Sequence, residues 1–244
     1  MKCQISSSLG RVLTGICIFS LMLSGCGKQE AATAVKAPAA PAKEKTAVSQ
    51  EQSMPREEAK EAPRPSGAPI KEERTFYDFE ADLDGWEIPM WAESKTDHVA
   101  RSIVVSRDVA SHGTSSMKVN ADFPGGLWSA GLVEIQQYLD LSNYRVIRAD
   151  IFLPKDAPIG LTAKMILTIG SNWKFVEMSR SYPLIPGEWL TIEANIEPGS
   201  YDWKRVVPDE EFAEDVRKVA IRVESNRKPK YTGDFYIDNI RVGR

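Results

Sequence analysis

The chain has 244 residues, and its 31 Lys and Arg against 34 Asp and Glu leave a net charge of only −3. This balance, without a basic stripe or a recognised binding motif, argues against a nucleic-acid partner. Its three cysteines, Cys3, Cys17 and Cys26, all lie near the N-terminus. The rest of the chain therefore has no thiol for catalysis, for a zinc cluster or for a disulfide.

Residues 1–25 are predicted to be a secretory signal. Lys2 and Arg11 precede an apolar stretch, residues 12–23, that is too short for a comfortable membrane span. The stretch ends in Leu-Ser-Gly-Cys, which resembles the lipobox of bacterial lipoproteins. This resemblance implies cleavage before Cys26 and lipidation of Cys26, so that acyl chains anchor the protein in a membrane. The alternative is an ordinary signal peptide that contains a cysteine.

Residues 26–73 are predicted to be the lipidated cysteine followed by a disordered tether. The segment is rich in Ala, Pro, Lys and Glu, and such a segment buries too little apolar surface to offset the entropy of ordering. Whether the tether needs its length, or is only a tail, stays open. Gly27 rather than Asp follows Cys26. The lipoprotein resemblance therefore implies the cell envelope, at the outer membrane or cell surface if the host is Gram-negative.

Residues 74–244 change to short apolar strands separated by turns. The side chains alternate, as in the row formed by Ile147, Ala149 and Ile151. Ten strands are expected, at 75–79, 101–109, 115–121, 131–139, 145–153, 161–169, 174–180, 190–196, 219–224 and 234–242. One helix is expected at 208–218, where Pro and acids open the segment and Arg-Lys closes it. Many short strands and little helix predict an all-β domain with the architecture of a β-sandwich.

Five segments of this domain carry a family resemblance. They are FYDFEADLDGW, SHGTSSMKV, LDLSNYRVIRADIFLP, PGEWLTIEANI and FYIDNIRV, in that order. The series resembles the galactose-binding-like jelly rolls, especially the carbohydrate-binding modules of bacterial polysaccharide-degrading enzymes, but no catalytic domain accompanies it here. The resemblance implies a non-catalytic, lipid-anchored carbohydrate-binding module that captures a polysaccharide at the bacterial cell envelope. A β-glucan or a mannan is the expected partner.

The last strand is interrupted by an acid beside an amide. In many modules of this family a structural calcium ion ties the first and last strands together. The resemblance places its ligands at Glu80, at the backbone near Ser111 and Gly113, and at Asp238. Calcium prefers about six to eight hard oxygen ligands. Asp78 is an alternative to Glu80, and the whole site has an alternative in which Asp238 accepts hydrogen bonds from backbone N–H groups.

Sugar rings have apolar faces and rims of hydroxyls, so their binding sites combine exposed aromatic rings with planar polar side chains. All six tryptophans lie in residues 74–244. Trp86 and Trp189 occupy positions that the family uses to close the sandwich, so a structural role is expected for both. The glycan-binding candidates are Trp91, Trp128, Trp173, Glu134 and Gln136. Trp203, expected in a surface loop, is a further choice, and the alternative for all of them is an ordinary solvated face.

Two other functions stay open. An enzyme would need catalytic carboxylates, but no pair stands in a recognisable motif. His98, expected at the surface, and His112, expected in a turn, are too isolated for a His-based metal site. The second alternative is a structural or protein-interaction lipoprotein of the envelope, because a fold does not fix a function. Glycan binding predicts at least two tryptophans exposed together, whereas the interaction hypothesis predicts mostly buried aromatic rings.

Overall fold

The computed structural model describes residues 69–244, and the predicted signal, Cys26 and most of the tether lie outside this part. It contains one short helix, α1 (Met90–Glu93). The strands are β1 (Glu73–Tyr77), β2 (Ala100–Ser106), β3 (Ser116–Pro124), β4 (Trp128–Leu139), β5 (Val146–Phe152), β6 (Leu161–Ile169), β7 (Lys174–Glu177), β8 (Tyr182–Pro183), β9 (Trp189–Asn195), β10 (Val216–Asn226) and β11 (Lys230–Gly243). No helix within residues 69–244 is long and apolar enough to cross a membrane.

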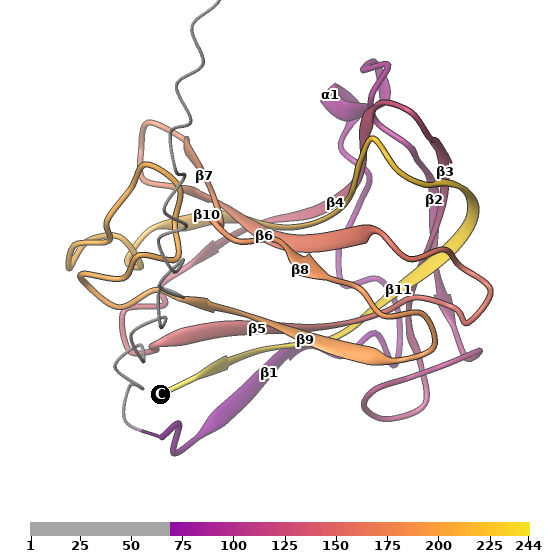
Figure 1. The fold of residues 1–244 in the computed structure, drawn as a ribbon. Coiled ribbons are helices and arrows are strands. Elements are labelled where there is room, and N and C mark those ends of the chain that lie inside the picture. Colours follow the sequence, from indigo (N-terminus) through magenta and orange to yellow (C-terminus); the bar gives the residue numbers. More distant parts are fainter. Residues whose placement is uncertain (1–68) are drawn as a thin grey trace, which may run out of the picture. The chain divides into compact units, whose positions relative to one another are not determined.

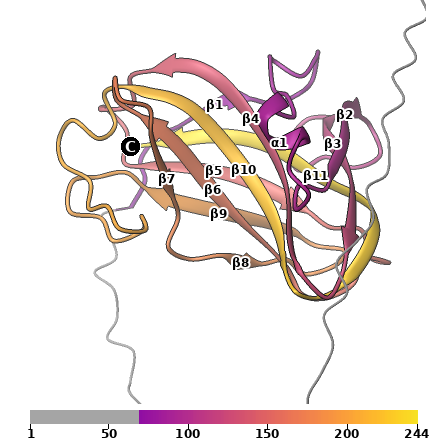
Figure 2. The ribbon, with the colours of Figure 1, turned by 90° about the horizontal axis from the view of Figure 1, so that it is seen from above.

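The strands form two antiparallel sheets that pack face to face (Figure 1). The six-stranded sheet has the order β2-β3-β11-β5-β9, with β1 paired to β11. The five-stranded sheet has the order β4-β10-β6-β7, with β8 paired to β6. Figure 2, seen from above, shows the long strands β4 and β10 running side by side. The β-sandwich predicted from the alternation is confirmed.

The core fills the space between the sheets with the inward members of each alternating row. Its largest wholly buried side chains include Phe79, Phe123 and Phe235. Trp86 is 3% exposed and makes edge-to-face contact with the ring of Phe79, so its predicted structural role is confirmed. Trp189 is half-buried and packs against Phe152, with 5.3 Å between ring centroids.

The helix expected at 208–218 does not form. Residues 210–214 make turns, and residue 216 already begins β10. Val216 is wholly buried and pairs with both β4 and β6, while Phe212 packs against Trp203 with 5.4 Å between ring centroids. Strand pairing and aromatic packing therefore override a weak local helix preference.

Ordered structure begins upstream of residue 74. The backbone N–H of Lys71 donates to the carbonyl of Arg244 across 2.7 Å, and the Arg244 N–H donates to the carbonyl of Glu72 across 3.0 Å. β1 starts at Glu73, whose carboxylate pairs with Arg148 and Arg241. A soluble form of the domain should therefore begin no later than residue 69.

The five-stranded sheet is bent, so that its outer face is concave. In Figure 1 the sheet dips between α1 near one end and β7 at the other. Val133, Met165 and Ile221 point from this sheet into the core. Their neighbours along each strand point the opposite way, because successive side chains of a strand alternate between faces. These outward residues make up the candidate functional site.

Candidate functional site

The concave face carries two hollows that adjoin each other. The aromatic hollow has a volume of about 430 Å³ and is lined by Trp91, Ala92, Lys95, Asp97, His98, Trp128, Ala130, Leu132, Phe175 and Arg222. The ionic hollow has a volume of about 480 Å³ and is lined by Trp128, Thr162, Lys164, Glu177, Ser181, Lys204, Arg222, Glu224 and Asn226. Because Trp128 and Arg222 line both, the two hollows form one continuous depression, here named the concave groove.

Three aromatic rings stand around the aromatic hollow. Trp91 on α1 is 47% exposed, Trp128 at the start of β4 is 39% exposed, and Phe175 on β7 is 54% exposed. A small apolar cluster lies on the same side of the sheet and consists of Leu132, Ile166 and Ala220. The three exposed rings thus offer flat apolar surface to a ligand.

Glu134 holds α1 against the sheet. Its Oε1 accepts a hydrogen bond from the indole Nε1 of Trp91 across 3.4 Å and from the Lys218 ammonium across 2.5 Å. The backbones of Glu134 and Glu87 also exchange two hydrogen bonds of 2.9 Å. Glu134 is only 5% exposed, so its carboxylate fixes the orientation of the Trp91 ring rather than lying open in the groove.

An array of ion pairs forms the floor of the ionic hollow. The Arg222 guanidinium pairs with Glu177 across 2.6 Å and with Glu224 across 3.0 Å. Lys164 lies 3.5 Å from Glu224, and Lys204 lies 2.7 Å from Glu177. Burial alone would raise the pKa of Glu177, but its hydrogen bonds and charge contacts with Lys204 and Arg222 lower that pKa below its ordinary value. Within residues 69–244, the Nε of Arg222 has no hydrogen-bond partner.

His98 lies in the wall of the aromatic hollow and is 7% exposed, so its expected surface position is wrong. The backbone of His98 forms an isolated β-bridge with Ala130 of β4, which places the residue against the sheet. The imidazole Nε2 lies 3.3 Å from the backbone of Leu132. Burial lowers the pKa of the imidazole. The ring is therefore neutral at pH 7.

The structure brings some of the predicted glycan-binding residues together and separates others. Trp91 and Trp128 line the concave groove, whereas Glu134 lines neither hollow and reaches the site only through its hydrogen bond with the Trp91 indole. Gln136 is exposed on β4 opposite Lys218 but lines neither hollow. Trp173 follows the turn after β6 and also lines neither hollow. Its ring instead contacts Tyr138, with 6.4 Å between centroids.

Trp203 does not lie at the surface as expected. It is 3% exposed, and its indole Nε1 donates to the carbonyl of Asn195 across 2.7 Å. Its polar neighbours in the sequence suggested exposure, but an indole can be buried when its N–H finds an acceptor.

Most residues of the concave groove were not singled out from the sequence. They include Lys164, Phe175, Arg222 and Glu224. The sequence indicated only that these residues lie on the outward face of strands that were correctly expected. Alternation of polar and apolar residues cannot distinguish a concave binding face from an ordinary solvated face, because it does not show how the sheet curves.

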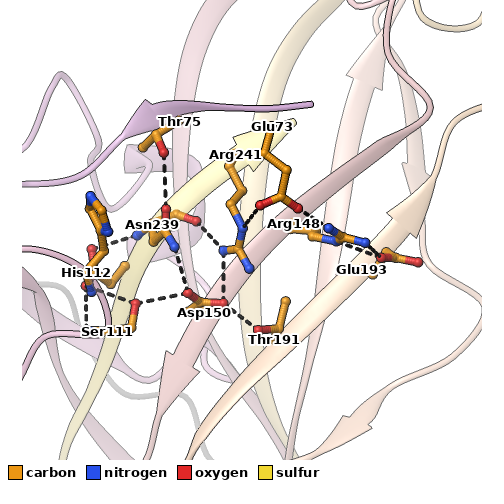
Figure 3. A network of polar contacts seen from close by, with 11 residues as sticks. Glu73, Thr75, Ser111, His112, Arg148, Asp150, Thr191, Glu193, Asn239 and Arg241 are labelled. Carbon is orange, nitrogen blue, oxygen red and sulfur yellow. Dashed lines mark hydrogen bonds and ion pairs between the residues drawn. The ribbon is translucent and has the colours of Figure 1, made fainter. Parts of the chain in front are cut away.

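The acid and the amide of the last strand belong to a polar network on the outer face of the six-stranded sheet (Figure 3). The wholly buried Asp238 carboxylate accepts backbone hydrogen bonds from Ser111 across 2.7 Å and from His112 across 3.0 Å. It also accepts the backbone N–H of Asn239 across 2.6 Å. Burial raises the pKa of Asp238, while these backbone donors lower it, and the net shift is upward. Asp238 thus holds the loop before β3 onto β11.

Asp150, directly opposite Asp238 on β5, extends this network. Its carboxylate accepts the Asn239 amide across 3.0 Å and the Thr191 hydroxyl across 2.6 Å. The guanidinium of Arg241 lies 3.0 Å from Asp150 and offsets its charge (Figure 3). The two neighbouring acids are therefore held by hydrogen-bond donors and one cation.

Glu80 holds the next part of the same loop. Its carboxylate accepts the backbone N–H of Thr114 across 2.7 Å, the Thr114 hydroxyl across 2.8 Å and the backbone N–H of Ser115 across 2.8 Å. The Thr114 bonds are the main reason that the pKa of Glu80 is lowered. Gly113 has φ of +65°, and a Cβ there would collide with the Glu80 carboxylate. The loop therefore needs glycine at this position.

These donors bear on the calcium expectation. A calcium ligand must present a free oxygen lone pair, whereas the carboxylates of Glu80 and Asp238 are both directed at N–H and O–H donors. Within residues 69–244 no group of three or more His, Cys, Asp or Glu is placed to hold a metal ion. The residues in this arrangement do not fit a calcium ion, and they match the alternative of backbone hydrogen bonding. Calcium binding itself stays a prediction.

Comparison with known proteins gives a family match. The family model described as "Mannanase, galactose-binding domain-like" matches residues 77–198. Together with the two-sheet architecture, this match confirms the galactose-binding-like fold that the sequence resemblance implied. None of the curated proteins compared with the chain matches it.

Several solved structures of carbohydrate-binding modules are similar to the chain. CBM27-1 of Caldicellulosiruptor saccharolyticus, in complex with mannohexaose, is 18% identical over 70% of this chain and 96% of its own, with a TM-score of 0.49. CBM28, a module specific for non-crystalline cellulose, is 13% identical over 68% and 92%, with a TM-score of 0.49. The family 11 module of Clostridium thermocellum, in complex with a mixed-linked tetrasaccharide, is 18% identical over 70% and 94%, with a TM-score of 0.45.

Proposed function

The chain belongs to the mannanase galactose-binding-domain-like family, and we propose that its domain is a non-catalytic carbohydrate-binding module that holds a polysaccharide chain in the concave groove. One observation carries this proposal. Two indole rings, Trp91 and Trp128, stand exposed at the same groove, beside the exposed ring of Phe175 and an ion-paired floor. Glycan binding requires such exposed rings in one groove. If the aromatic rings were buried, the protein-interaction hypothesis would be favoured instead.

The two hollows supply complementary chemistry. The apolar face of a pyranose ring can lie on the indole of Trp128, because flat apolar surfaces exclude water from each other. Its hydroxyls can then exchange hydrogen bonds with polar side chains that line the ionic hollow, such as Lys204 and Asn226. The ion pairs hold the groove side chains in place before the ligand arrives, so little side-chain entropy is lost on binding.

The charge pattern of the groove favours a neutral polymer. Both carboxylates of its floor, on Glu177 and Glu224, are paired with Lys and Arg. A mannan or a β-glucan fits this pattern, and the family description names mannanase, which favours mannan. The same pairs support a non-catalytic role, since a general acid needs a carboxyl whose pKa is raised. Release of reducing ends from mannan by the purified protein would contradict that role.

Affinity gel electrophoresis tests the binding function. A soluble form covering residues 69–244 is run through gels that contain mannan, glucomannan, β-glucan or xylan. We expect one of the β-linked mannans or glucans to slow the protein, and Trp128→Ala to restore its free mobility. Tyr201→Ala is the matched control, because Tyr201 is 85% exposed and lines neither hollow. If no polymer slows the protein, an envelope protein that interacts with other proteins becomes the better hypothesis.

The lipid anchor is the second part of the proposal. The lipobox-like Leu-Ser-Gly-Cys supports lipidation of Cys26, which would hold the module at the cell envelope. Labelled palmitate fed to cells that express the full chain should appear in the protein and disappear in Cys26→Ser. Label that persists in Cys26→Ser would contradict the anchor without touching the carbohydrate-binding proposal.

A further inference from the structure

A third hollow lies away from the concave groove, between β1 and the end of β4. It has a volume of about 360 Å³ and is lined by Arg74, Thr75, Phe76, Tyr77, Gln137, Tyr138, Leu139, Asp140 and Tyr144. It shares no lining residue with the concave groove. Trp128 and Tyr138 lie ten positions apart on β4, which is about 33 Å at the rise of an extended strand. The hollow is therefore spatially separate, and it is large enough for a small ligand.

Aromatic rings surround this edge hollow. Phe76 and Tyr144 meet edge to face with 6.1 Å between centroids, and the Arg74 guanidinium lies 5.4 Å from the Phe76 ring. Tyr138 is 63% exposed and meets Trp173 edge to face. Through Tyr138 the hollow thus adjoins Trp173, a predicted glycan-binding residue that the concave groove leaves out.

Arg217 fixes the rings of this extension. Its guanidinium lies 5.4 Å from the Tyr138 centroid and 5.0 Å from the Trp173 centroid. Asp215 holds the guanidinium in turn, across 2.9 Å. Two exposed aromatic rings are therefore held by one cation, which preserves their orientation without burying them.

Several polar groups of the edge hollow are free to bind a ligand. Within residues 69–244, no hydrogen bond or ion pair engages the Arg74 guanidinium, the Gln137 amide nitrogen or the hydroxyls of Tyr138 and Tyr144. Gln137 is nevertheless oriented, because its side-chain oxygen accepts the Tyr77 hydroxyl. Flat rings beside free, oriented donors match a molecule with an apolar face and many hydroxyls, which is the chemistry of a pyranose.

We propose that the edge hollow, together with Trp173, is a second carbohydrate-binding site that takes a short stretch or an end of a β-linked neutral glycan. This inference rests on the proposed glycan-binding function of the domain, but the second site consists of residues that do not line the concave groove. Two sites on one domain would let a single molecule hold two chains, or two parts of one chain, and so gain avidity for a polymer over an oligosaccharide.

NMR spectra of a protein labelled with the heavy nitrogen isotope test the two sites separately, because each tryptophan indole N–H gives its own resonance. A soluble form that starts at Gly27 is titrated with mannohexaose and with cellohexaose. We expect the Trp173 resonance to shift in Trp128→Ala, where the concave groove is disabled. We expect Tyr138→Ala to abolish the Trp173 shift and to leave the Trp91 shift intact. Tyr201→Ala is again the control, and it should change neither shift.

The outcomes separate the two proposals. If Trp91 shifts in the wild type but Trp173 never moves in Trp128→Ala, the edge site is overturned and the concave groove stands. If Trp173 shifts and Trp91 does not, the concave groove fails and the edge site stands. If neither resonance moves with either sugar, both sites are overturned for these glycans.

Discussion

Arg222 lies beside Trp128, with its guanidinium carbon 5.7 Å from the centroid of the indole ring. This pair joins the two halves of the concave groove, because Trp128 provides apolar surface for one hollow and Arg222 anchors the ion pairs of the other. A ligand that crosses the groove must pass both side chains. Substitutions at these two positions therefore test the proposed binding site most directly.

Trp128→Ala should weaken polysaccharide binding strongly. The indole is a central aromatic surface of the groove, and removing such a residue from an interface costs about 2 kcal/mol or more, roughly 30-fold in affinity. Isothermal titration with a soluble oligosaccharide measures the loss. Because Trp128 is 39% exposed, we expect the melting temperature to change little. An affinity loss equal to that of Tyr201→Ala would contradict the proposed site.

Arg222→Lys should weaken binding while keeping the charge. The Nη2 of Arg222 contacts both Glu177 and Glu224 while the guanidinium lies beside the Trp128 ring. Lysine has a compact ammonium in place of the planar guanidinium, so it cannot reproduce both sets of contacts, and the floor of the ionic hollow should lose its fixed geometry. We expect an affinity loss of roughly 5- to 10-fold, about 1 to 1.4 kcal/mol. Arg180→Lys is the matched control, since Arg180 is exposed and outside both hollows. Equal affinities of the two variants would argue against a role for Arg222.

Much of the fold could be predicted from the sequence, because a buried strand face imposes a period of two on the residues. All ten expected strands have counterparts, whereas β8, with two residues, and α1, with four, are too short to show a period. The helix expected at 208–218 does not form, and Phe212 within this segment packs against Trp203. That contact joins neighbouring loops in space, and no local pattern encodes it.

The site was less accessible to prediction for a physical reason. Trp91 and Trp128 stand out because large aromatic rings in polar surroundings need an explanation. Phe175 and Arg222 look like ordinary outward residues until the bend of the sheet brings them to the groove. Trp173, like Trp128, is a tryptophan that follows a turn in the sequence, yet its ring contacts Tyr138 and lies outside the concave groove. The position of an exposed ring on the folded sheet depends on how the strands pair, and the local sequence does not show this.

Asp238→Asn should destabilise the fold. The carboxylate is wholly buried and accepts three backbone N–H groups, and an amide would remove the charge and set its own N–H against one of these donors. The loss should be about 2 to 4 kcal/mol in the free energy of unfolding, measured by urea denaturation. Glu211→Gln, at an exposed position, is the control. A loss no larger than that of Glu211→Gln would show that the polar network contributes little.

Removal of calcium should leave the stability unchanged. The backbone donors of the Ser111–Ser115 loop already occupy the oxygens of Asp238 and Glu80, so an ion would have to displace hydrogen bonds that the fold uses. Differential scanning calorimetry with EDTA and with calcium chloride should give the same melting temperature. A rise with calcium that saturates at one ion per chain would instead establish the structural metal expected from the family resemblance, because a ligand that binds only the folded state raises its stability.

Glu80→Gln should destabilise the protein at neutral pH and progressively less in acid. The Thr114 and Ser115 donors lower the pKa of the Glu80 carboxyl in the folded state, whereas in the unfolded chain this pKa is about 4.3. The folded state therefore prefers the ionised form. This contribution is fully present above the unfolded pKa and is lost as the pH falls through the lowered folded pKa.

The difference in melting temperature between the wild type and Glu80→Gln should accordingly be largest between about pH 6 and 7 and should shrink below about pH 4. Thermal unfolding followed by circular dichroism across this range measures it. Glu211→Gln again serves as the control, because that exposed carboxyl has no hydrogen bond within residues 69–244. A difference that stays constant down to pH 2 would mean that the glutamine fails for reasons of shape, and that the charge of Glu80 does not hold the loop.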